Sequence, residues 1–415
     1  MSQPPSPDRG LRLRAALGAG RAASALSRLT GRGSGGVIGG RVVLKVQPAT
    51  PRLLSRGRTV MLVSGTNGKT TTTAMLTAAM GALGPVASNA DGANTPPGFV
   101  AALADPRAER VVLETDEGWL PWTVTQTRPE LALLLNLSRD QLTRHHEVGK
   151  LAVSWRSALS DVPTAVGNAD DPDVVWAAMA SPKQVWVAAG QWWTQDSVAC
   201  PRCGNRCHRD GVAWRCGSCE LARPEPDWWV EGDDLVSADV RIPLQLPLPG
   251  RFNKANAAMV VAAAVQQGAD AQTVVQAMRE VRTVAGRYAV QDYRGRRIRL
   301  LLAKNPAGWL ETIQLISQGD APLVLAFNSQ GVDGRDPSWL YDVSFRSLAG
   351  RRIAVIGERS ADMGVRLKLD GLEYVDAGRR LRDALDLLPP GQVDVLANYT
   401  AFQDARRELA HAQGQ

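Results

Sequence analysis

The chain has 415 residues, of which 44% are hydrophobic and 21% charged, and its formal net charge is +7. This length suggests two or three domains with ample core, and the composition is that of an ordinary globular protein. The chain has no run of about 18 apolar residues, which excludes a transmembrane helix, and no apolar signal-peptide core, so we expect a cytoplasmic protein.

A basic segment covers residues 1–45, with its arginines concentrated between Arg9 and Arg32. It predicts either a solvated helix behind a mobile chain start or a surface for anionic lipid or a phosphate-bearing substrate. No nucleic-acid-binding module accompanies the charge, so we do not expect nucleic acid as a partner. The glycine-rich residues 33–40 predict a loop.

A phosphate-binding turn follows the apolar run 60–63 and precedes a stretch that can form a helix. In such a turn the backbone N–H groups and the helix N-terminus face the phosphates. Lys69 adds a positive charge, and the Thr70 hydroxyl can ligate Mg²⁺. The chain is therefore predicted to bind ATP and Mg²⁺ through this turn, which consists of Gly65, Thr66, Asn67, Gly68, Lys69, Thr70 and Thr71.

Short apolar runs alternate with helical stretches from about residue 59 to 190, which predicts a parallel sheet with helices on both faces. Buried strands are expected at 111–113 and 131–137, and Ala-rich helical sequence at 255–280. We expect an ATP-binding α/β domain over 46–295 and a second, Rossmann-like α/β domain over 298–415. The strands expected in the second domain are 298–303, 323–328, 353–356 and 393–397.

All five cysteines lie between residues 200 and 219, and four of them form two Cys-x-x-Cys pairs. Two such pairs suit a tetrahedral zinc ribbon, in which each tight turn supplies two thiolates. Four thiolates leave no open position, so the Zn²⁺ would be structural; disulfides and free thiols remain as alternatives. We expect the ribbon as an insertion at about 196–225, with Cys207 as a spare thiol and with Cys200, Cys203, Cys216 and Cys219 as ligands.

Further polar side chains complete the predicted ATP site. Glu114 follows a buried strand directly, at the edge where open α/β sheets bind ligands, and we expect it to be a catalytic carboxylate and a Mg²⁺ ligand. Asp116 and Glu117 come next and also fit a solvated turn. Asn253 and Asn256 are expected on one helical face, where carboxamides can read an adenine edge.

The compact form of the turn at 65–71 resembles that of the Mur ligases, the ATP-dependent amide-forming enzymes of peptidoglycan synthesis. Residues 136–145, 168–171 and 248–256 resemble three more segments of this family, in the same order. Gly286-Arg287 resembles the Gly-Arg that ends its ATP-binding domain, which implies that Arg287 contacts phosphate. Gln141 stands where the family usually has a metal-binding histidine, so the resemblance does not extend to a second metal site.

Together with the cysteine pairs, residues 302–308, 333–342 and 398–401 resemble the MurT-type subunits of lipid II isoglutaminyl synthases. The resemblance implies a heterodimer with a GatD-type glutaminase, which releases ammonia from glutamine. The chain would activate the α-carboxyl of D-Glu in the lipid II stem peptide with ATP, and ammonia would displace phosphate to give D-isoglutamine. A peripheral position at the inner face of the cell membrane would suit a lipid-linked substrate.

The resemblance also implies roles for side chains of the second domain. Lys304 and Asn305 are candidates for binding the activated carboxylate or the ATP phosphates. The loop over 333–342 has two interpretations: either Asp333 and Arg335 shape the ligase cleft, or Asp336 or Asp342 faces the partner and orients its catalytic histidine. The expected catalytic residues are therefore Lys69, Glu114, Lys304, Asp336 and Asp342.

Two other classes of function stay open. A Mur-like ligase of another type would add an amino acid instead of ammonia, although the cysteine pairs and residues 304–308 speak against it. A zinc-ribbon binding module without enzymatic activity would keep ATP as a structural ligand, although Lys69, Thr70 and Glu114 are intact.

Overall fold

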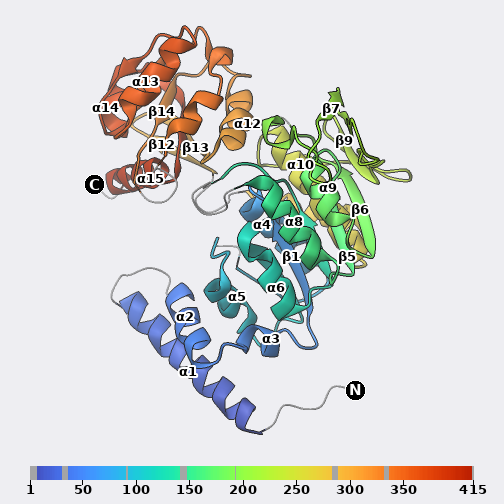
Figure 1. The fold of residues 1–415 in the computed structure, drawn as a ribbon. Coiled ribbons are helices and arrows are strands. Elements are labelled where there is room, and N and C mark those ends of the chain that lie inside the picture. Colours follow the sequence, from blue (N-terminus) through green and yellow to red (C-terminus); the bar gives the residue numbers. More distant parts are fainter. Residues whose placement is uncertain are drawn as a thin grey trace.

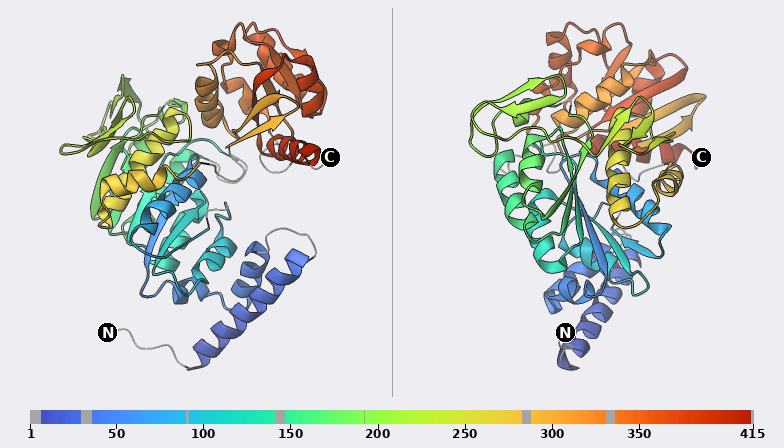
Figure 2. Two further views of the ribbon diagram at one scale, coloured as in Figure 1. Left: turned by 180° about the vertical axis from the view of Figure 1, so that it is seen from behind. Right: turned by 90° about the vertical axis from the view of Figure 1, so that its right-hand side faces the viewer.

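The chain folds into a helical hairpin and two α/β bodies, which follow one another along the sequence (Figure 1). The computed structural model describes residues 7–29, 36–89, 92–140, 147–191, 193–282, 288–330 and 336–413. The hairpin lies at one end, the body with the larger sheet in the middle, and the body with the smaller sheet at the other end (Figures 1 and 2). No helix in these ranges combines the length and the hydropathy needed to cross a membrane.

The middle body is built on a nine-stranded sheet with the strand order β11-β10-β9-β6-β5-β4-β1-β3-β2. The strands from β9 to β2 pair in parallel, and β10 and β11 extend the sheet as antiparallel neighbours. In chain order the strands are β1 (Thr59–Ser64), β2 (Val86–Ser88), β3 (Arg110–Thr115), β4 (Leu131–Leu134), β5 (Thr164–Asn168), β6 (Lys183–Ala188), β9 (Trp228–Glu231), β10 (Asp234–Val236) and β11 (Arg241–Pro243).

Helices cover both faces of this sheet, because successive side chains of a strand point to opposite faces and both sets are apolar here. On β1, Met61 and Val63 pack in one core cluster, whereas Val60 and Leu62 pack in another. The first face is covered by α4 (Lys69–Gly81), α10 (Arg251–Gln266) and α11 (Ala271–Met278). The second face is covered by α5 (Pro96–Leu103), α6 (Leu120–Thr127), α8 (Val148–Leu159) and α9 (Pro172–Ala178).

The C-terminal body has a six-stranded sheet with the order β12-β13-β17-β14-β15-β16, in which only β12 pairs antiparallel. Its strands are β12 (Tyr288–Tyr293), β13 (Arg296–Leu302), β14 (Leu323–Ala326), β15 (Ile353–Ile356), β16 (Val375–Asp376) and β17 (Gly391–Ala397). Its helices are α12 (Pro306–Ile316), α13 (Ser360–Leu369), α14 (Leu381–Leu387) and α15 (Tyr399–Gln413). The α12 and α13 side chains pack on one face and those of α14 and α15 on the other.

The cysteine-bearing segment leaves the middle body after β6 and returns to it at β9. It forms a separate two-stranded sheet of β7 (Cys207–Asp210) and β8 (Ala213–Cys216). Trp214 and Leu221 pack against Val175 of α9, and the Trp214 indole N–H donates to the Ala169 carbonyl at 2.9 Å. The insertion is thus anchored on the segment that follows β5.

The N-terminal hairpin consists of α1 (Pro7–Leu29) and α2 (Gly36–Val46), and a short α3 (Thr50–Leu54) leads into β1. The prediction of a loop over residues 33–40 is therefore wrong for residues 36–40, which are helical; residues 33–35 lie outside the described ranges. The glycines have a packing role, since a Cβ at Gly39 would overlap α1 and a Cβ at Gly40 would overlap Pro97 of α5.

The predicted fold class, a parallel-sheet α/β domain followed by a second α/β domain, is confirmed. The strands expected near 111–113, 298, 323, 353 and 393 all form, and the Ala-rich stretch forms α10 and α11. The strand expected over 131–137 ends at Leu134. The residues that follow leave the sheet and bind the phosphate-binding turn, where the Thr66 N–H donates to the Asn136 carbonyl.

Candidate active site between the two α/β bodies

The turn between β1 and α4 has the backbone that a phosphate loop requires. Gly65 and Gly68 have φ values of 148° and 87°, which favour glycine. Neither position has room for a side chain, because a Cβ on Gly65 would lie 2.8 Å from the Leu135 Cβ and one on Gly68 would lie 2.9 Å from Asn256 Oδ1. Gly68 caps α4 without any side-chain hydrogen bond, so the N-terminus of this helix can receive an anion.

The segment that follows β4 holds this turn in shape. The Asn67 N–H donates to Asn136 Oδ1 at 2.9 Å, and Asn136 Nδ2 donates back to the Asn67 carbonyl at 3.0 Å. The Ser138 N–H donates to Thr66 Oγ1 at 3.0 Å. These bonds satisfy the outer part of the turn and leave the N-terminus of α4 as its anion-binding end.

Lys69 is buried, and its ammonium group is paired. Its Nζ donates to Glu117 Oε2 at 2.8 Å and to the Gly65 carbonyl at 2.5 Å. Burial by itself would raise the pKa of Glu117, but the charges of Lys69 and Lys304 and the bond from Lys69 outweigh burial and hold this pKa below its ordinary value. Glu117 therefore carries a negative charge beside Lys69, a role that the sequence left open between site and solvated turn.

Glu114 lies at the end of β3 with no exposed surface, next to the start of α4. Its Oε1 accepts hydrogen bonds from Thr70 Oγ1 at 3.2 Å and from Asn94 Nδ2 at 3.3 Å. A hydroxyl and a carboxylate oxygen that lie side by side are ligands of the kind that Mg²⁺ takes beside substrate phosphates. The residues present thus fit a magnesium ion at this place.

A cavity of about 200 Å³ extends from the turn into the space between the two bodies. Residues of the middle body line one side, among them Asn136, Asn253 and Asn256. Residues 301–304 and one face of α12 line the other side. Asn253 and Asn256 are both buried on the first turns of α10, and the Asn256 amide lies against Gly68. The cleft combines apolar walls with a few convergent polar groups, as small-molecule sites do.

The C-terminal body reaches the turn through Lys304 and Asn305. Lys304 Nζ donates to Asp140 Oδ2 at 2.6 Å, and Asn305 Nδ2 donates to Asn67 Oδ1 at 3.1 Å. Burial and the charge of Glu117 raise the pKa of Asp140, although Lys304 acts in the opposite direction. Asn305 also caps α12, where its Oδ1 accepts from the Gly308 N–H. The two bodies therefore meet at the phosphate-binding turn.

Glu311 of α12 faces the same cavity, and the sequence analysis did not single it out as a site residue. Burial raises the pKa of Glu311 to about 7, even though Arg251 lies nearby and favours the charged form. The Arg251 guanidinium is 3.6 Å from Glu311 Oε1, and the Glu311 side chain is 23% exposed. Glu311 therefore changes charge near neutral pH inside the cleft.

Other predicted site residues lie away from the turn or outside the described ranges. Asp342, in the 3₁₀ helix η3 (Ser338–Asp342), lies 3.3 Å from an Arg139 guanidinium nitrogen. Arg139 Nε in turn donates to Asp196 Oδ1 at 2.6 Å. Asp336 is exposed and accepts from the Ser338 N–H, and hydrogen bonding by the side chain and the backbone of Ser338 lowers the pKa of Asp336. Arg287 lies outside the described residues, as does Gln141.

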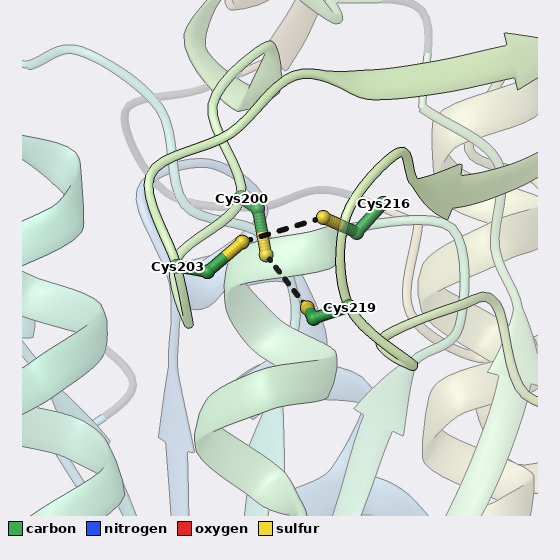
Figure 3. Close-up of side chains that lie close together, drawn as sticks. All are labelled: Cys200, Cys203, Cys216 and Cys219. Atoms are coloured by element: carbon green, nitrogen blue, oxygen red, sulfur yellow. Dashed lines mark hydrogen bonds between the residues drawn. The ribbon is translucent and has the colours of Figure 1, made fainter.

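The four cysteines of the two pairs converge at the tip of the insertion (Figure 3). Their sulfur atoms all lie within 4.8 Å of one another, with 3.7 Å between Cys200 and Cys219 and 3.4 Å between Cys203 and Cys216. These separations are far longer than a disulfide bond. They are close to the edge of a ZnS₄ tetrahedron, which is about 3.8 Å for Zn–S bonds of about 2.3 Å. The geometry of the cluster therefore suits a metal ion, and Cys207 is not part of the cluster.

Comparisons with known proteins agree with this architecture. The Mur ligase middle domain family matches residues 63–199, and the MurT ligase C-terminal family matches residues 302–402. The subunit MurT of lipid II isoglutaminyl synthase (glutamine-hydrolyzing) from Streptococcus pneumoniae is 28% identical over 94% of this chain and 94% of its own length.

Solved structures share the fold at low sequence identity. MurF from Acinetobacter baumannii has a TM-score of 0.67 and 17% identity, over 90% of this chain and 81% of that chain. MurF ligase from Thermotoga maritima, solved in complex with ADP, has a TM-score of 0.63 and 17% identity, over 91% and 84%.

The fold and the cleft beside the glycine-rich turn define a ligase of the Mur type. Within this class, the order of the two matched domains and the similarity along nearly the whole chain indicate the MurT type. The chain carries a Mur ligase middle domain and a MurT ligase C-terminal domain, and it is similar along nearly its whole length to MurT subunits.

The buried pair of Lys69 and Glu117 leads to a stability prediction. Glu117→Leu should lower the free energy of unfolding by about 3–5 kcal/mol, because it leaves the Lys69 charge buried without its partner. The double variant Lys69→Met/Glu117→Leu should recover most of this loss, since no charge is then left unpaired. Urea unfolding at neutral pH measures both.

The exposed pair Glu147–Lys150 is the control. The same change there, Glu147→Leu, should cost less than about 1 kcal/mol. Equal losses in the single and double variants would contradict the argument.

Glu311 leads to a prediction about pH. The pKa of Glu311 is about 7 in the folded protein and about 4.5 in the unfolded chain. Between these two pH values the folded form therefore still holds a proton on Glu311, whereas the unfolded form has released it. Stability should therefore fall as the pH rises through this window, by about 3 kcal/mol. Glu311→Gln should remove this component, so the difference between the two proteins in urea unfolding should grow with pH. A difference that does not change with pH would contradict the raised pKa.

Proposed function

We propose that the chain is the ligase subunit of a lipid II amidating enzyme. It would use ATP to convert the α-carboxylate of D-Glu in the lipid II stem peptide to an amide, giving D-isoglutamine. The observation that carries the proposal is the cleft between the two bodies, which Lys69, Thr70 and Lys304 line and where Thr70 is hydrogen-bonded to the buried Glu114. The similarity to subunit MurT along the whole chain supports the same reaction.

ATP is the first substrate in this proposal. Residues 65–71 and the N-terminus of α4 would bind its phosphates, and Asn253 and Asn256 would bind its base. The ADP complex of the MurF ligase from Thermotoga maritima supports a nucleotide in a fold of this kind. Thr70 and Glu114 would hold Mg²⁺, which neutralises phosphate charge when it is bound. Arg287 would add a further contact to phosphate.

The carboxylate of the stem peptide would approach from the side of the C-terminal body. An oxygen of this carboxylate attacks the γ-phosphorus, ADP leaves, and an acyl phosphate forms. Ammonia then attacks the acyl carbon, phosphate leaves, and the nitrogen loses a proton to give the amide. Lys69 and Lys304 would counter the negative charge that gathers on the transferred phosphoryl group. Their pairing with Glu117 and Asp140 keeps both ammonium groups positioned.

The ammonia would come from a partner subunit, a GatD-type glutaminase. A glutaminase needs an activated nucleophile, and this chain offers none among its five cysteines. Four of them converge on one metal site, and burial raises the pKa of Cys207 to about 11, so it stays a thiol. Of the two carboxylates considered for the partner's histidine, Asp336 is the better candidate, because Arg139 already engages Asp342.

The insertion would bind one structural Zn²⁺ through its four converging thiolates. The metal would hold the tip of the insertion, whose base carries Arg209 and Arg223. Arg209 donates to Gln191 Oε1 at 2.7 Å and Arg223 to Asp170 Oδ1 at 2.7 Å, so the insertion also braces the edge of the middle body. All four ligand positions are taken by protein sulfur, so no position remains for a substrate.

Elemental analysis of the purified chain tests the metal. We expect one zinc per chain, loss of this zinc in Cys216→Ser, and full zinc content in Cys207→Ser, because only Cys216 belongs to the cluster. Cys207→Ser is the matched control for the loss of one thiol. Zinc retained by Cys216→Ser, or lost from Cys207→Ser, would contradict the assigned ligand set.

Mass spectrometry tests the reaction. Lipid II is incubated with this chain, a GatD-type glutaminase, ATP and glutamine labelled with ¹⁵N at its amide. We expect a labelled amide on the second stem residue, and we expect Lys69→Ala to lower the rate by about 10²–10³-fold or more. Lys150→Ala, which removes a lysine side chain that is 66% exposed, is the control.

The same assay separates the remaining alternatives. Unchanged lipid II in the presence of an active, bound partner would contradict the proposal, and incorporation of an amino acid would identify another type of Mur ligase. Glutamine hydrolysis by the complex tests the role of Asp336. Asp336→Asn should slow hydrolysis, and an unchanged rate would show that the partner does not use this carboxylate.

A further inference from the structure

The basic residues of the chain are distributed very unevenly. Residues 9–58 contain eleven Lys and Arg and no Asp or Glu, and the next acidic residue is Asp91. The remaining residues contain 37 basic and 41 acidic side chains, so the excess positive charge lies entirely in the N-terminal hairpin and its connection to β1. Figure 1 places this hairpin at one end of the molecule, away from the C-terminal body.

The inner face of α1 is fixed on α2. Ala16 and Ser27 are buried there, and a Cβ on Gly20 would overlap the Val43 side chain of α2. Further along the hairpin, the Arg12 Nε donates to the Val46 carbonyl. Because α2 is itself close-packed on α5 at Gly40, the hairpin presents a fixed outer face to the surroundings.

This outer face of α1 is apolar. Leu11, Leu26 and Leu29 are 66%, 64% and 85% exposed. Between them Ala15, Gly18, Ala22 and Ala25 are exposed as well. Positions 11, 15, 18, 22, 26 and 29 are three or four residues apart, so they form one stripe along a helix with 3.6 residues per turn, and position 25 lies beside it. Large exposed leucines on a close-packed helix need an explanation, because most such side chains are buried.

A row of arginines runs beside this stripe. Arg14, Arg21 and Arg28 are seven residues apart and exposed, which places them in line along one border of the apolar stripe. An apolar stripe with cationic side chains along its border is the arrangement of helices that lie flat in the surface of an anionic membrane. The leucines enter the boundary between headgroups and acyl chains, and the guanidinium groups bind the lipid phosphates.

We propose that the outer face of α1 docks on an anionic lipid surface, with Leu11, Leu26 and Leu29 inserted and with Arg14, Arg21 and Arg28 on the headgroups. The charge pattern favours lipid over a second copy of the chain as the occupant. Two copies joined through this face would bring arginine rows together, and between residues 7 and 58 only Asp8, at the start of α1, is acidic. The proposal does not rest on the proposed reaction, because it requires only the lipid surface.

Vesicle co-sedimentation with the full chain tests this docking. The vesicles consist either of phosphatidylcholine alone or of phosphatidylcholine with phosphatidylglycerol, and they contain no lipid II. The chain should bind only the anionic vesicles, and less strongly as the salt concentration rises. The triple variant Arg14→Gln/Arg21→Gln/Arg28→Gln should lower the partition coefficient by about 100-fold. Leu11→Ser/Leu26→Ser/Leu29→Ser should lower it by about tenfold or more.

Two matched controls separate the face of α1 from general surface properties. Arg107, Arg346 and Arg407, with side chains 85%, 77% and 72% exposed, are changed together to Gln in the first control. Val212, Leu369 and Leu387, which are 68%, 62% and 57% exposed, are changed together to Ser in the second. Both controls should bind vesicles as the unchanged chain does. Circular dichroism and the Kd for ATP, measured on every variant, show whether the fold is intact.

Three results would overturn the proposal. The first is equal binding to both kinds of vesicle or to neither. The second is binding that survives the α1 arginine variant or falls as far in the arginine control. The third is a dimer in light scattering that the α1 leucine variant dissolves, which would assign this face to a second copy of the chain.

Discussion

The reciprocal hydrogen bonds between Asn67 and Asn136 are the interaction on which the site depends. They join the turn after β1 to the segment after β4, 69 residues later in the chain. The same short segment continues through Ser138, Arg139 and Asp140, which bind Thr66, Asp196 and Lys304. The phosphate-binding turn, the base of the insertion and the C-terminal body are thus positioned by five consecutive residues.

Charge inside the cleft is arranged in neutral pairs. Lys69 lies against Glu117, and Lys304 lies against Asp140, with all four side chains largely withdrawn from water. An isolated buried ammonium group would lose its proton or be drawn out to solvent, whereas a paired one keeps its charge and its position. This arrangement holds two cations in the cleft where we propose that the nucleotide binds.

The two additions to the α/β core have different physical roles. The cysteine-bearing insertion has little apolar core of its own, so its shape depends on the four converging sulfur atoms and on the indole of Trp214. The hairpin of α1 and α2, in contrast, is held by close helix packing at Gly20, Gly39 and Gly40. The first addition braces the middle body, and the second gives the molecule a cationic, apolar outer face.

The sequence by itself determined the features that depend on local order. The glycine-rich turn, the buried strands and the two Cys-x-x-Cys pairs are short-range patterns whose geometry follows from neighbouring residues. Only the tertiary structure decided which distant groups meet. Nothing in the spacing of Glu117, Asp140, Arg139 or Glu311 indicates their partners, because each partner lies on an element that is distant in the sequence or in the other body. The prediction of a loop for the glycines of α2 fails for the same reason. Gly39 and Gly40 are required by close contact with α1 and α5, and the sequence does not show which helices will pack there.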